Sequence, residues 1–461
     1  MKRRSFGLLA TTSLLALTSR HAFAQTGPDP SLLKTILTPV GAERAGNADG
    51  SIPPWTGGYT TIPDGWTPGS FMPDPFIDDE PVVVINSSNL DQYSTRLTDG
   101  LMTQIKTSGM TVKVYPTHRS AAQPQANYEN IASNIATATL DPNGGRLGFS
   151  NAFGGIPFPI PDASDPLMAG AQIMWNHVCR WQGWGSKATV WSYVVSGANA
   201  PVLASMYKVT QFYPFYSKGG SYSVRNDRIV AVYLADDLAP PNINGEEIIA
   251  QYWLNPAQQP TDVWELLQGQ GRVRRAPELS FDTPSFSADG IANFDEYYGF
   301  IGSLEKYDWK LIGKKEIYIP YHNNTLVGAT AEEIHTPNFL NPELIRYELH
   351  RVWVVEATLH PGERNVLARR RYYLDEDTWT IAYHDAWDAN NNLVRVDVSF
   401  NFIRPDLPGT IYVGQVINNL QAQAYVTVLS VNEKAKPSWS FYDTEDIGLF
   451  DPNNMAASAQ Y

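Results

Sequence analysis

Residues 393–403 read LVRVDVSFNFI, a run in which apolar and polar side chains alternate. Val396, Val398, Phe400 and Phe402 would face one side of an extended segment, and the polar residues between them the other. A period of two is typical of a β-strand with one buried face. The run therefore predicts a strand of an antiparallel sheet.

Three more strand-like segments precede this run and are separated by short turns. The turns are HPGE at 360–363, DED at 375–377 and DANNN at 388–392. Such turns join antiparallel neighbours, because parallel strands need a long crossover. Residues 344–403 therefore predict a four-stranded up-and-down meander built from LIRYELHRVWVVEATL, VLARRRYYL, WTIAYHDAW and the opening run.

The chain before about residue 189 has a helical period instead. Apolar residues three and four apart predict helices over 90–108, 123–140 and 165–182. The third has the clearest start, because Asp165 suits the N-cap and Pro166 the first helical position.

These patterns predict an α+β fold in which one large antiparallel sheet curls around helices to bury its apolar face. Residues 25–85 are rich in Gly and Pro and predict an extended arm. Residues 86–461 predict a single domain.

One face of the strand at 344–359 is broad, aromatic and nearly uncharged, with Arg351 as the exception. We expect this face, the apolar face of 393–403 and the covering helix to enclose a ligand cavity. The predicted lining residues are Trp175, Trp181, Tyr347, Leu349, Trp353, Val355, Val396, Val398, Phe400 and Phe402. Plain core packing is the alternative for each of them.

The first 24 residues predict a cleaved export signal. Arg3 and Arg4 lie in a basic start, a short apolar run follows, and Ala22 and Ala24 form an A-x-A cleavage site. The run is too short to span a membrane. The arginine pair resembles a twin-arginine signal, and an ordinary Sec signal is the alternative. Either route predicts a periplasmic protein, cleaved after Ala24.

Charge and cysteine content exclude several classes of protein. The formal charge of −13 becomes −17 once four basic residues leave with the signal, since 30 basic residues then face 47 acidic ones. Such a surface disfavours nucleic acid and anionic lipid surfaces. The single cysteine, Cys179, rules out an intramolecular disulfide. No later stretch has transmembrane length, so we expect no stable membrane insertion.

We find no motif for a catalytic nucleophile, a metal or a phosphate, and we expect neither catalytic residues nor a cofactor. Two basic clusters remain, at Arg272, Arg274 and Arg275 and at residues 369–371. Strand residues paired with carboxylates are the first interpretation of both clusters. A polar contact surface for an acidic partner or a lipid headgroup, with Arg351, is the alternative.

Several long motifs resemble the periplasmic family called domain of unknown function 1329. They include WELLQGQGRVRRAPELSFDTP, YDWKLIGKKEIYIPY and LNPELIRYELHRVWVVEATLHPGERN. The phrase W-x-L-x4-RVRR is also similar to a strand of outer-membrane lipoprotein-sorting (Lol) proteins. The resemblance implies a half-barrel closed by helices over a hydrophobic cavity. It also implies resistance-nodulation-division exporters or outer-membrane proteins as partners.

We therefore expect a periplasmic carrier for a hydrophobic ligand, such as a lipid, an acyl chain or a lipoprotein anchor. A cell-envelope hydrolase using dispersed carboxylates is one alternative. A scaffold or adaptor of an exporter complex that carries no ligand is another.

Overall fold

The computed structural model describes residues 28–216, 228–239, 244–256, 259, 261–267, 272–276, 282–430, 439–443 and 447–458. The predicted export signal, with Arg3, Arg4, Ala22 and Ala24, lies outside these residues. No helix within the described ranges is long and apolar enough to cross a membrane.

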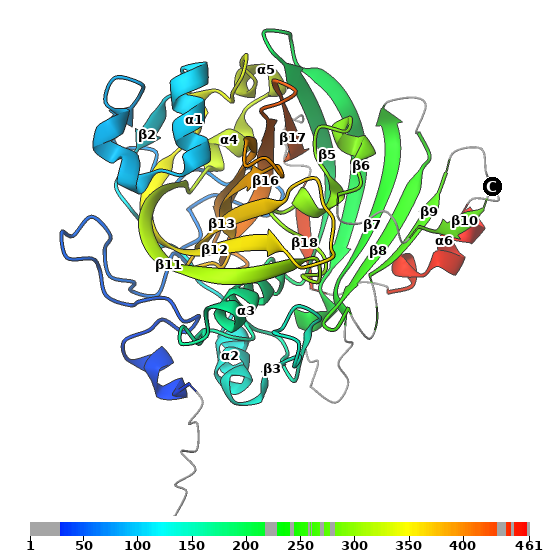
Figure 1. The fold of residues 1–461 in the computed structure, drawn as a ribbon, viewed down its shortest axis with the longest axis horizontal. Coiled ribbons are helices and arrows are strands. Elements are labelled where there is room, and N and C mark those ends of the chain that lie inside the picture. The colour runs from blue at the N-terminus through cyan, green and yellow to red at the C-terminus, as the bar shows by residue number, and fades with distance from the viewer. Residues whose placement is uncertain are drawn as a thin grey trace, which may run out of the picture.

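A single large curved sheet dominates the molecule (Figure 1). Its strand order is β1-β2-β12-β13-β14-β15-β16-β17-β5-β6-β7-β8-β9-β10, with β11 beside β12 and β18 beside β5. The strands are β1 (Val83–Ile85), β2 (Val112–Val114), β5 (Gly185–Ser196), β6 (Val202–Phe212), β7 (Arg228–Ala239), β8 (Glu247–Trp253), β9 (Asp262–Leu266), β10 (Val273–Arg275), β11 (Tyr307–Pro320), β12 (Tyr347–Leu359), β13 (Arg369–Asp375), β14 (Ile381–Trp387), β15 (Leu393–Arg404), β16 (Gly409–Asn419), β17 (Ala424–Ser430) and β18 (Ser440–Tyr442).

The predicted meander is confirmed, because β12, β13, β14 and β15 pair in that order and all antiparallel. Val355, Tyr372, His384 and Asp397 lie opposite one another across the four strands. Among the described strands, the one parallel contact joins the short strand β2 to β12. The predicted α+β class with a large curved antiparallel sheet is also confirmed.

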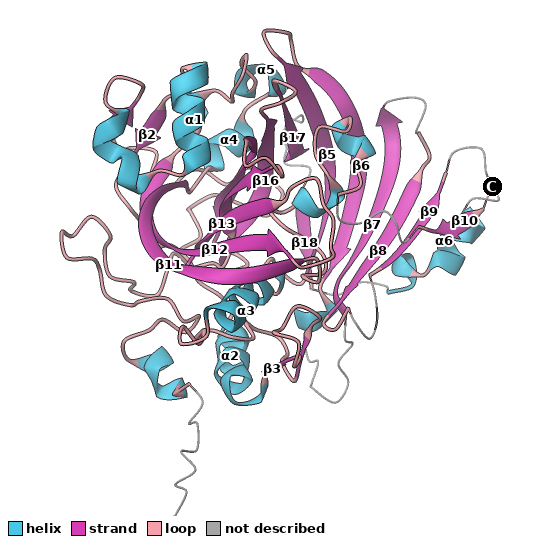
Figure 2. Ribbon diagram, viewed as in Figure 1, coloured by secondary structure: helices cyan, strands magenta, loops and turns pink. Residues whose placement is uncertain are grey.

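Helices gather in two groups beside the sheet (Figure 2). The first group is α1 (Asp99–Ser108), α4 (Asn324–Gly328) and α5 (Ala331–Ile334), and the second is α2 (Gln125–Thr137) and α3 (Pro166–Val178). Helix α3 packs on β11, and α2 lies beyond it. Helix α6 (Pro452–Ser458) lies beside β9 and β10, and a small sheet pairs β3 (Thr139–Leu140) with β4 (Phe149–Ser150).

The predicted helices are shorter than expected, and the first is divided. A 3-10 helix covers Leu90–Arg96, and α1 begins only at Asp99. The break comes at Thr98, whose hydroxyl accepts a hydrogen bond from the Leu101 amide and caps α1. Gly109 ends α1 in the left-handed conformation, as expected from its position.

The arm that precedes β1 packs on the rest of the protein through its own aromatic side chains and through its backbone. The Trp55 indole donates to the Ala121 carbonyl at 2.8 Å. The Trp379 indole donates to the Val40 carbonyl at 3.0 Å.

The predicted start of α3 is confirmed, and it supports a stability prediction. The Asp165 carboxylate accepts hydrogen bonds from the amides of Leu167 and Met168 at the helix N-terminus. Asp165→Ala removes this cap, so we expect the free energy of unfolding to fall by about 1 kcal/mol. Urea denaturation would measure this change. Replacing the exposed Asp64 in the same way should leave stability unchanged, and an equal loss there would contradict the role of the cap.

Candidate functional site

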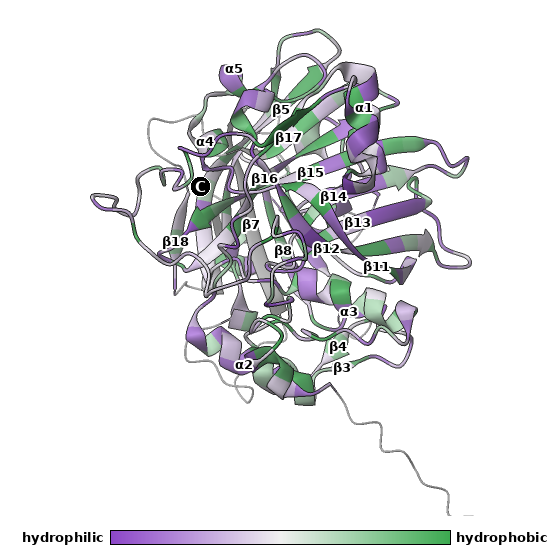
Figure 3. Ribbon diagram, turned by 90° about the vertical axis from the view of Figure 1, so that its left-hand side faces the viewer, coloured by the Kyte–Doolittle hydropathy of each residue, from purple (hydrophilic) through white to green (hydrophobic). Residues whose placement is uncertain are grey.

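The four predicted residues of β15 share one face, and helices of the first group cover that face. A side chain at Gly100 of α1 would meet the Val396 methyl groups. Phe400 contacts a crevice under α4 and α5. The other face of β15 is polar, with Arg395 beside Glu296 at 3.2 Å. Figure 3 shows this alternation of hydrophobic and hydrophilic residues along the strands.

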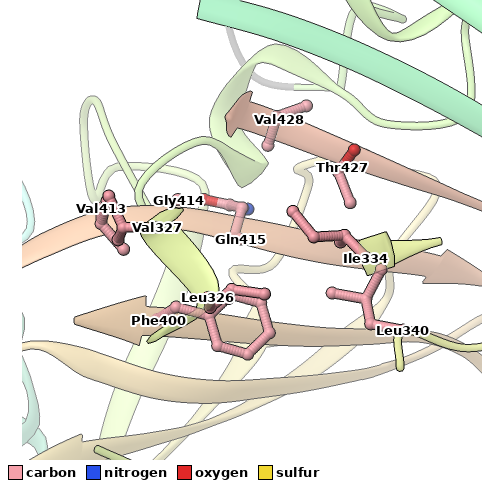
Figure 4. A pocket seen from close by; sticks show the side chains of 10 residues that line it. All are labelled: Leu326, Val327, Ile334, Leu340, Phe400, Val413, Gly414, Gln415, Thr427 and Val428. Carbon is pink, nitrogen blue, oxygen red and sulfur yellow. The ribbon is translucent and has the colours of Figure 1, made fainter. Parts of the chain in front are cut away.

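The crevice at Phe400 is apolar but small (Figure 4). Its volume is about 40 Å³, which is room for about one water molecule. Its lining residues are Leu326, Val327, Ile334, Leu340, Phe400, Val413, Gly414, Gln415, Thr427 and Val428.

The two predicted tryptophans lie in other surroundings. Trp175 in α3 packs against Phe149 and donates to the Gly145 carbonyl at 2.7 Å. Trp181, just after α3, contacts the ring of Tyr216. Helix α3 thus packs on β11, whereas α1, α4 and α5 cover the apolar face of β15.

The predicted residues of β12 are packed into the core. Tyr347, Leu349 and Val355 are buried, and Trp353 stacks on Trp379 with ring centroids 6.1 Å apart. The ten predicted residues thus have several different sets of described neighbours, and ligand contact by them stays a prediction. An alternating pattern shows which residues share a face, but it does not show what covers that face.

Five of the six arginines in the two basic clusters lie in strands and pair with carboxylates, as the first interpretation of the sequence expects, and a contact surface stays a prediction. The ion pairs are Arg274 with Glu265, Arg275 with Asp262, Arg369 and Arg371 with Glu356, and Arg370 with Asp295. Arg272 is exposed. Arg351 is buried and pairs with Glu376 at 3.4 Å and with Glu43 of the arm at 3.5 Å.

A buried network of charged side chains joins β12 to the arm and to the turn after β13. Glu348 accepts hydrogen bonds from Arg346, His322 and the His118 amide at 2.5, 2.7 and 2.8 Å. Burial would raise the pKa of Glu348, but His322, His350 and Arg346 hold that pKa well below its usual value. The network therefore favours an ionised carboxylate.

Three members of this region have the residue types of a metal site. Ligand atoms of His350, Asp375 and Asp377 lie within 4.8 Å of one another. However, Arg119 donates to both oxygens of Asp377, at 2.6 and 2.8 Å. His350 is also close to Glu348, at 3.3 Å. Arg119 therefore already compensates the charge of Asp377, and Glu348 already engages His350, so we assign no metal to the group.

An open pocket between α2 and α3 has the size of a ligand site. Its volume is about 500 Å³, within the range of about 300–1,000 Å³ usual for small-molecule sites. Its lining residues are Pro28, Ile135, Ala138, Thr139, Leu140, Asp141, Pro142, Gly144, Pro157, Phe158, Pro159, Ile160, Asp165, Met168 and Gln172. In the sequence, only the helical periods and the prolines mark the segments that line this pocket. Neither feature shows that the two helices lie far enough apart to leave a pocket between them.

The polar side chains of the α2–α3 pocket are already engaged with the backbone. Asp165 caps α3, and Asp141 accepts from the amides of Asn143 and Leu147. Gln172 accepts from the Asp162 amide at 2.9 Å. Because these polar groups already have hydrogen-bond partners, they need no charged ligand, and the pocket suits an apolar one.

Comparisons with known proteins match most of the chain. The family model described as "Protein of unknown function (DUF1329)" matches residues 84–456. The chain is 37% identical over 400 residues to the uncharacterized protein PA3922 of Pseudomonas aeruginosa. The alignment covers 84% of this chain and 85% of that protein.

Two solved structures are also similar. A DUF1329 family protein from Desulfovibrio piger has a TM-score of 0.41 at 14% identity, covering 63% of this chain and 99% of its own. The LolA superfamily protein NE2245 from Nitrosomonas europaea has a TM-score of 0.35 at 10% identity, and the match covers 62% of this chain and 98% of that chain. Because the family model matches residues 84–456, which is far more than half of the chain, this protein belongs to the DUF1329 family.

Proposed function

We propose that this protein is a periplasmic carrier for a hydrophobic ligand, such as a lipid, an acyl chain or a lipoprotein anchor. The α2–α3 pocket would receive the apolar part of that ligand. We further propose that it binds without catalysis and works with an envelope export system. The predicted export signal supports the compartment.

The volume of the α2–α3 pocket carries this proposal. A pocket of about 500 Å³ accepts a chain of many carbon atoms, whereas the 40 Å³ crevice under α4 and α5 does not. Each methylene group that leaves water gains about 0.8 kcal/mol. A largely apolar wall of Ile135, Leu140, Phe158 and Ile160 is therefore enough for useful affinity.

Met168→Glu should weaken binding of the uncharged probe 1-N-phenylnaphthylamine at least tenfold. Met168 lines the pocket and is 37% exposed, so a carboxylate there places charge beside the apolar ligand. An acidic residue in the first turn of a helix favours folding, so lost binding would not result from unfolding. Fluorescence titration of the purified protein would measure the change.

Leu167→Glu is the matched control, because Leu167 is the adjacent residue, is 52% exposed and is absent from the pocket lining. It should bind the probe as the wild type does. Equal binding by Met168→Glu and the wild type would rule out the α2–α3 pocket. Native mass spectrometry of protein purified from the periplasm, followed by organic extraction, should also reveal a co-purifying lipid.

A further inference from the structure

The side chains that line the α2–α3 pocket carry negative charge and no positive charge. Asp141 and Asp165 are acidic, and none of the lining residues is Lys, Arg or His. Both carboxylates accept hydrogen bonds from backbone amides, which have no net charge. These bonds satisfy the two side chains as acceptors, but they leave their formal charges beside the pocket.

The ends of the two helices differ in what they offer to this pocket. The positive N-terminus of α3 offsets part of the Asp165 charge, but its first amides already donate to that carboxylate. The C-terminal end of α2 also borders the pocket, through Ile135 and Ala138, and its last turn has no basic residue. A helix C-terminus contributes about half of a negative charge, so this end adds to the charge of Asp141.

The wall of the pocket is also poor in hydrogen-bond donors. A proline nitrogen has no hydrogen, and the prolines among the lining residues are Pro28, Pro142, Pro157 and Pro159. The Phe158 amide, between two of them, donates to the Asn176 side chain at 2.9 Å. An anionic head group needs donors to replace the water that it loses, whereas a cationic head group needs acceptors, which carboxylates and carbonyls supply.

Two basic residues lie near the lining segments in the sequence, but neither supplies a positive charge to the pocket wall. Arg146 pairs with Asp308 at 3.7 Å and donates to the Glu305 carbonyl. Lys34 ends the 3-10 helix Pro30–Lys34, which contacts α2, but it is exposed and does not line the pocket. Water and salt screen an exposed charge of this kind.

We propose that the α2–α3 pocket selects an amphiphile whose polar end is a cation, an amine or an ammonium group, and disfavours anionic amphiphiles. This selection rests on the proposed function of the pocket and names the chemical class of the ligand head group. The apolar tail would pack on Leu140 and Phe158, and the cation would lie near Asp141 and Asp165. Because Asp165 is exposed and Asp141 is half-buried, we expect a preference of about tenfold.

Displacement of 1-N-phenylnaphthylamine from the mature protein by decylamine, 1-decanol and decanoate tests the proposal. The three compounds share one chain length, and at about pH 7 their head groups are cationic, uncharged and anionic. Half-displacement by decylamine should need about one tenth of the concentration that decanoate needs, with 1-decanol between them. The difference should shrink in about 0.5 M salt, because salt screens charges that are in contact with water.

The double variant Asp141→Asn, Asp165→Asn removes both charges and keeps an oxygen acceptor for the backbone amides. Asparagine caps a helix as well as aspartate does, so α3 should still form. The preference for decylamine over decanoate should fall by about fivefold or more. Asp388→Asn is the matched control, because Asp388 also accepts from backbone amides, those of Asn390 and Asn392, and does not line the pocket. It should keep the preference of the wild type.

Equal half-displacement concentrations for decylamine and decanoate, tighter binding of decanoate, or a preference that the double variant leaves unchanged would overturn the charge selection. Binding of the uncharged probe and its displacement by 1-decanol would still support the proposed function in that case. If the wild type does not bind the probe, or if 1-decanol does not displace it, the proposed function fails and the charge selection fails with it. The two failures are therefore distinguishable.

Discussion

Glu348→Ala is expected to lower the free energy of unfolding by about 3–5 kcal/mol. Glu348 is fully buried and is the shared acceptor for Arg346, His322 and the His118 amide. Removing it leaves these buried donors without their shared acceptor. Breaking a buried ion pair by removing one partner costs far more than breaking an exposed pair, because one charge stays buried and unpaired.

Urea denaturation followed by tryptophan fluorescence would measure the change. Glu343→Ala is the matched control, because Glu343 also pairs with a basic residue, Lys113, but its side chain is 66% exposed. An exposed pair of this kind contributes about 0–1 kcal/mol. Similar losses in the two variants would show that the network around Glu348 adds little to stability.

The free energy of unfolding should fall more steeply with decreasing pH in the wild type than in Glu348→Ala. The pKa of Glu348 is depressed in the folded state, because His322, His350 and Arg346 outweigh the effect of its burial. A depressed carboxyl pKa contributes stability above the unfolded value near 4.5, and that stability is lost as the pH falls through the folded pKa. Unfolding measured between about pH 6 and pH 3 should show this difference.

Gly170→Ala is expected to lower the free energy of unfolding by about 3 kcal/mol, although alanine is the better helix former. Gly170 lies within α3 where the helix crosses β11. An added Cβ would lie 2.4 Å from the carbonyl oxygen of Trp309 and 2.6 Å from its carbonyl carbon. Backbone atoms of a paired strand cannot rotate away as a flexible side chain can, so helix and sheet must separate.

Gly328→Ala in α4 is the control, because we do not expect it to lower the free energy of unfolding. Nothing lies within 4 Å of a Cβ added there. Alanine should therefore leave stability unchanged or raise it by up to about 1 kcal/mol. Denaturant midpoints of the two variants would test the contact between α3 and β11, and a stabilised Gly170→Ala protein would contradict it.

Local patterns predicted the parts of the fold that depend on local chemistry. The meander of β12–β15 could be predicted because alternation and short turns operate between neighbouring residues. The same holds for Asp165 at the start of α3. The division at Thr98 was missed because the apolar period continues through it, while the cap depends on a single hydroxyl.

The candidate sites could not be predicted in this way. The shared face of Val396 and Phe400 follows from alternation, but only the packing of α1, α4 and α5 shows that it is covered. The α2–α3 pocket depends on how far two helices stand apart. The sequence by itself determined the sheet, its meander and the family, because hydrophobic period and turn chemistry act locally.

Only the tertiary structure decided which charges are compensated. Arg351 and Arg180 appear alike in the sequence, as single basic residues among apolar and aromatic neighbours. In the fold, Arg351 pairs with Glu376 and with Glu43 of the arm, whereas the buried Arg180 lies among tyrosines and beside His177, whose pKa burial holds well below its usual value. The electrostatic energy of a charge depends on what lies within a few ångströms of it, and those neighbours come from distant parts of the chain.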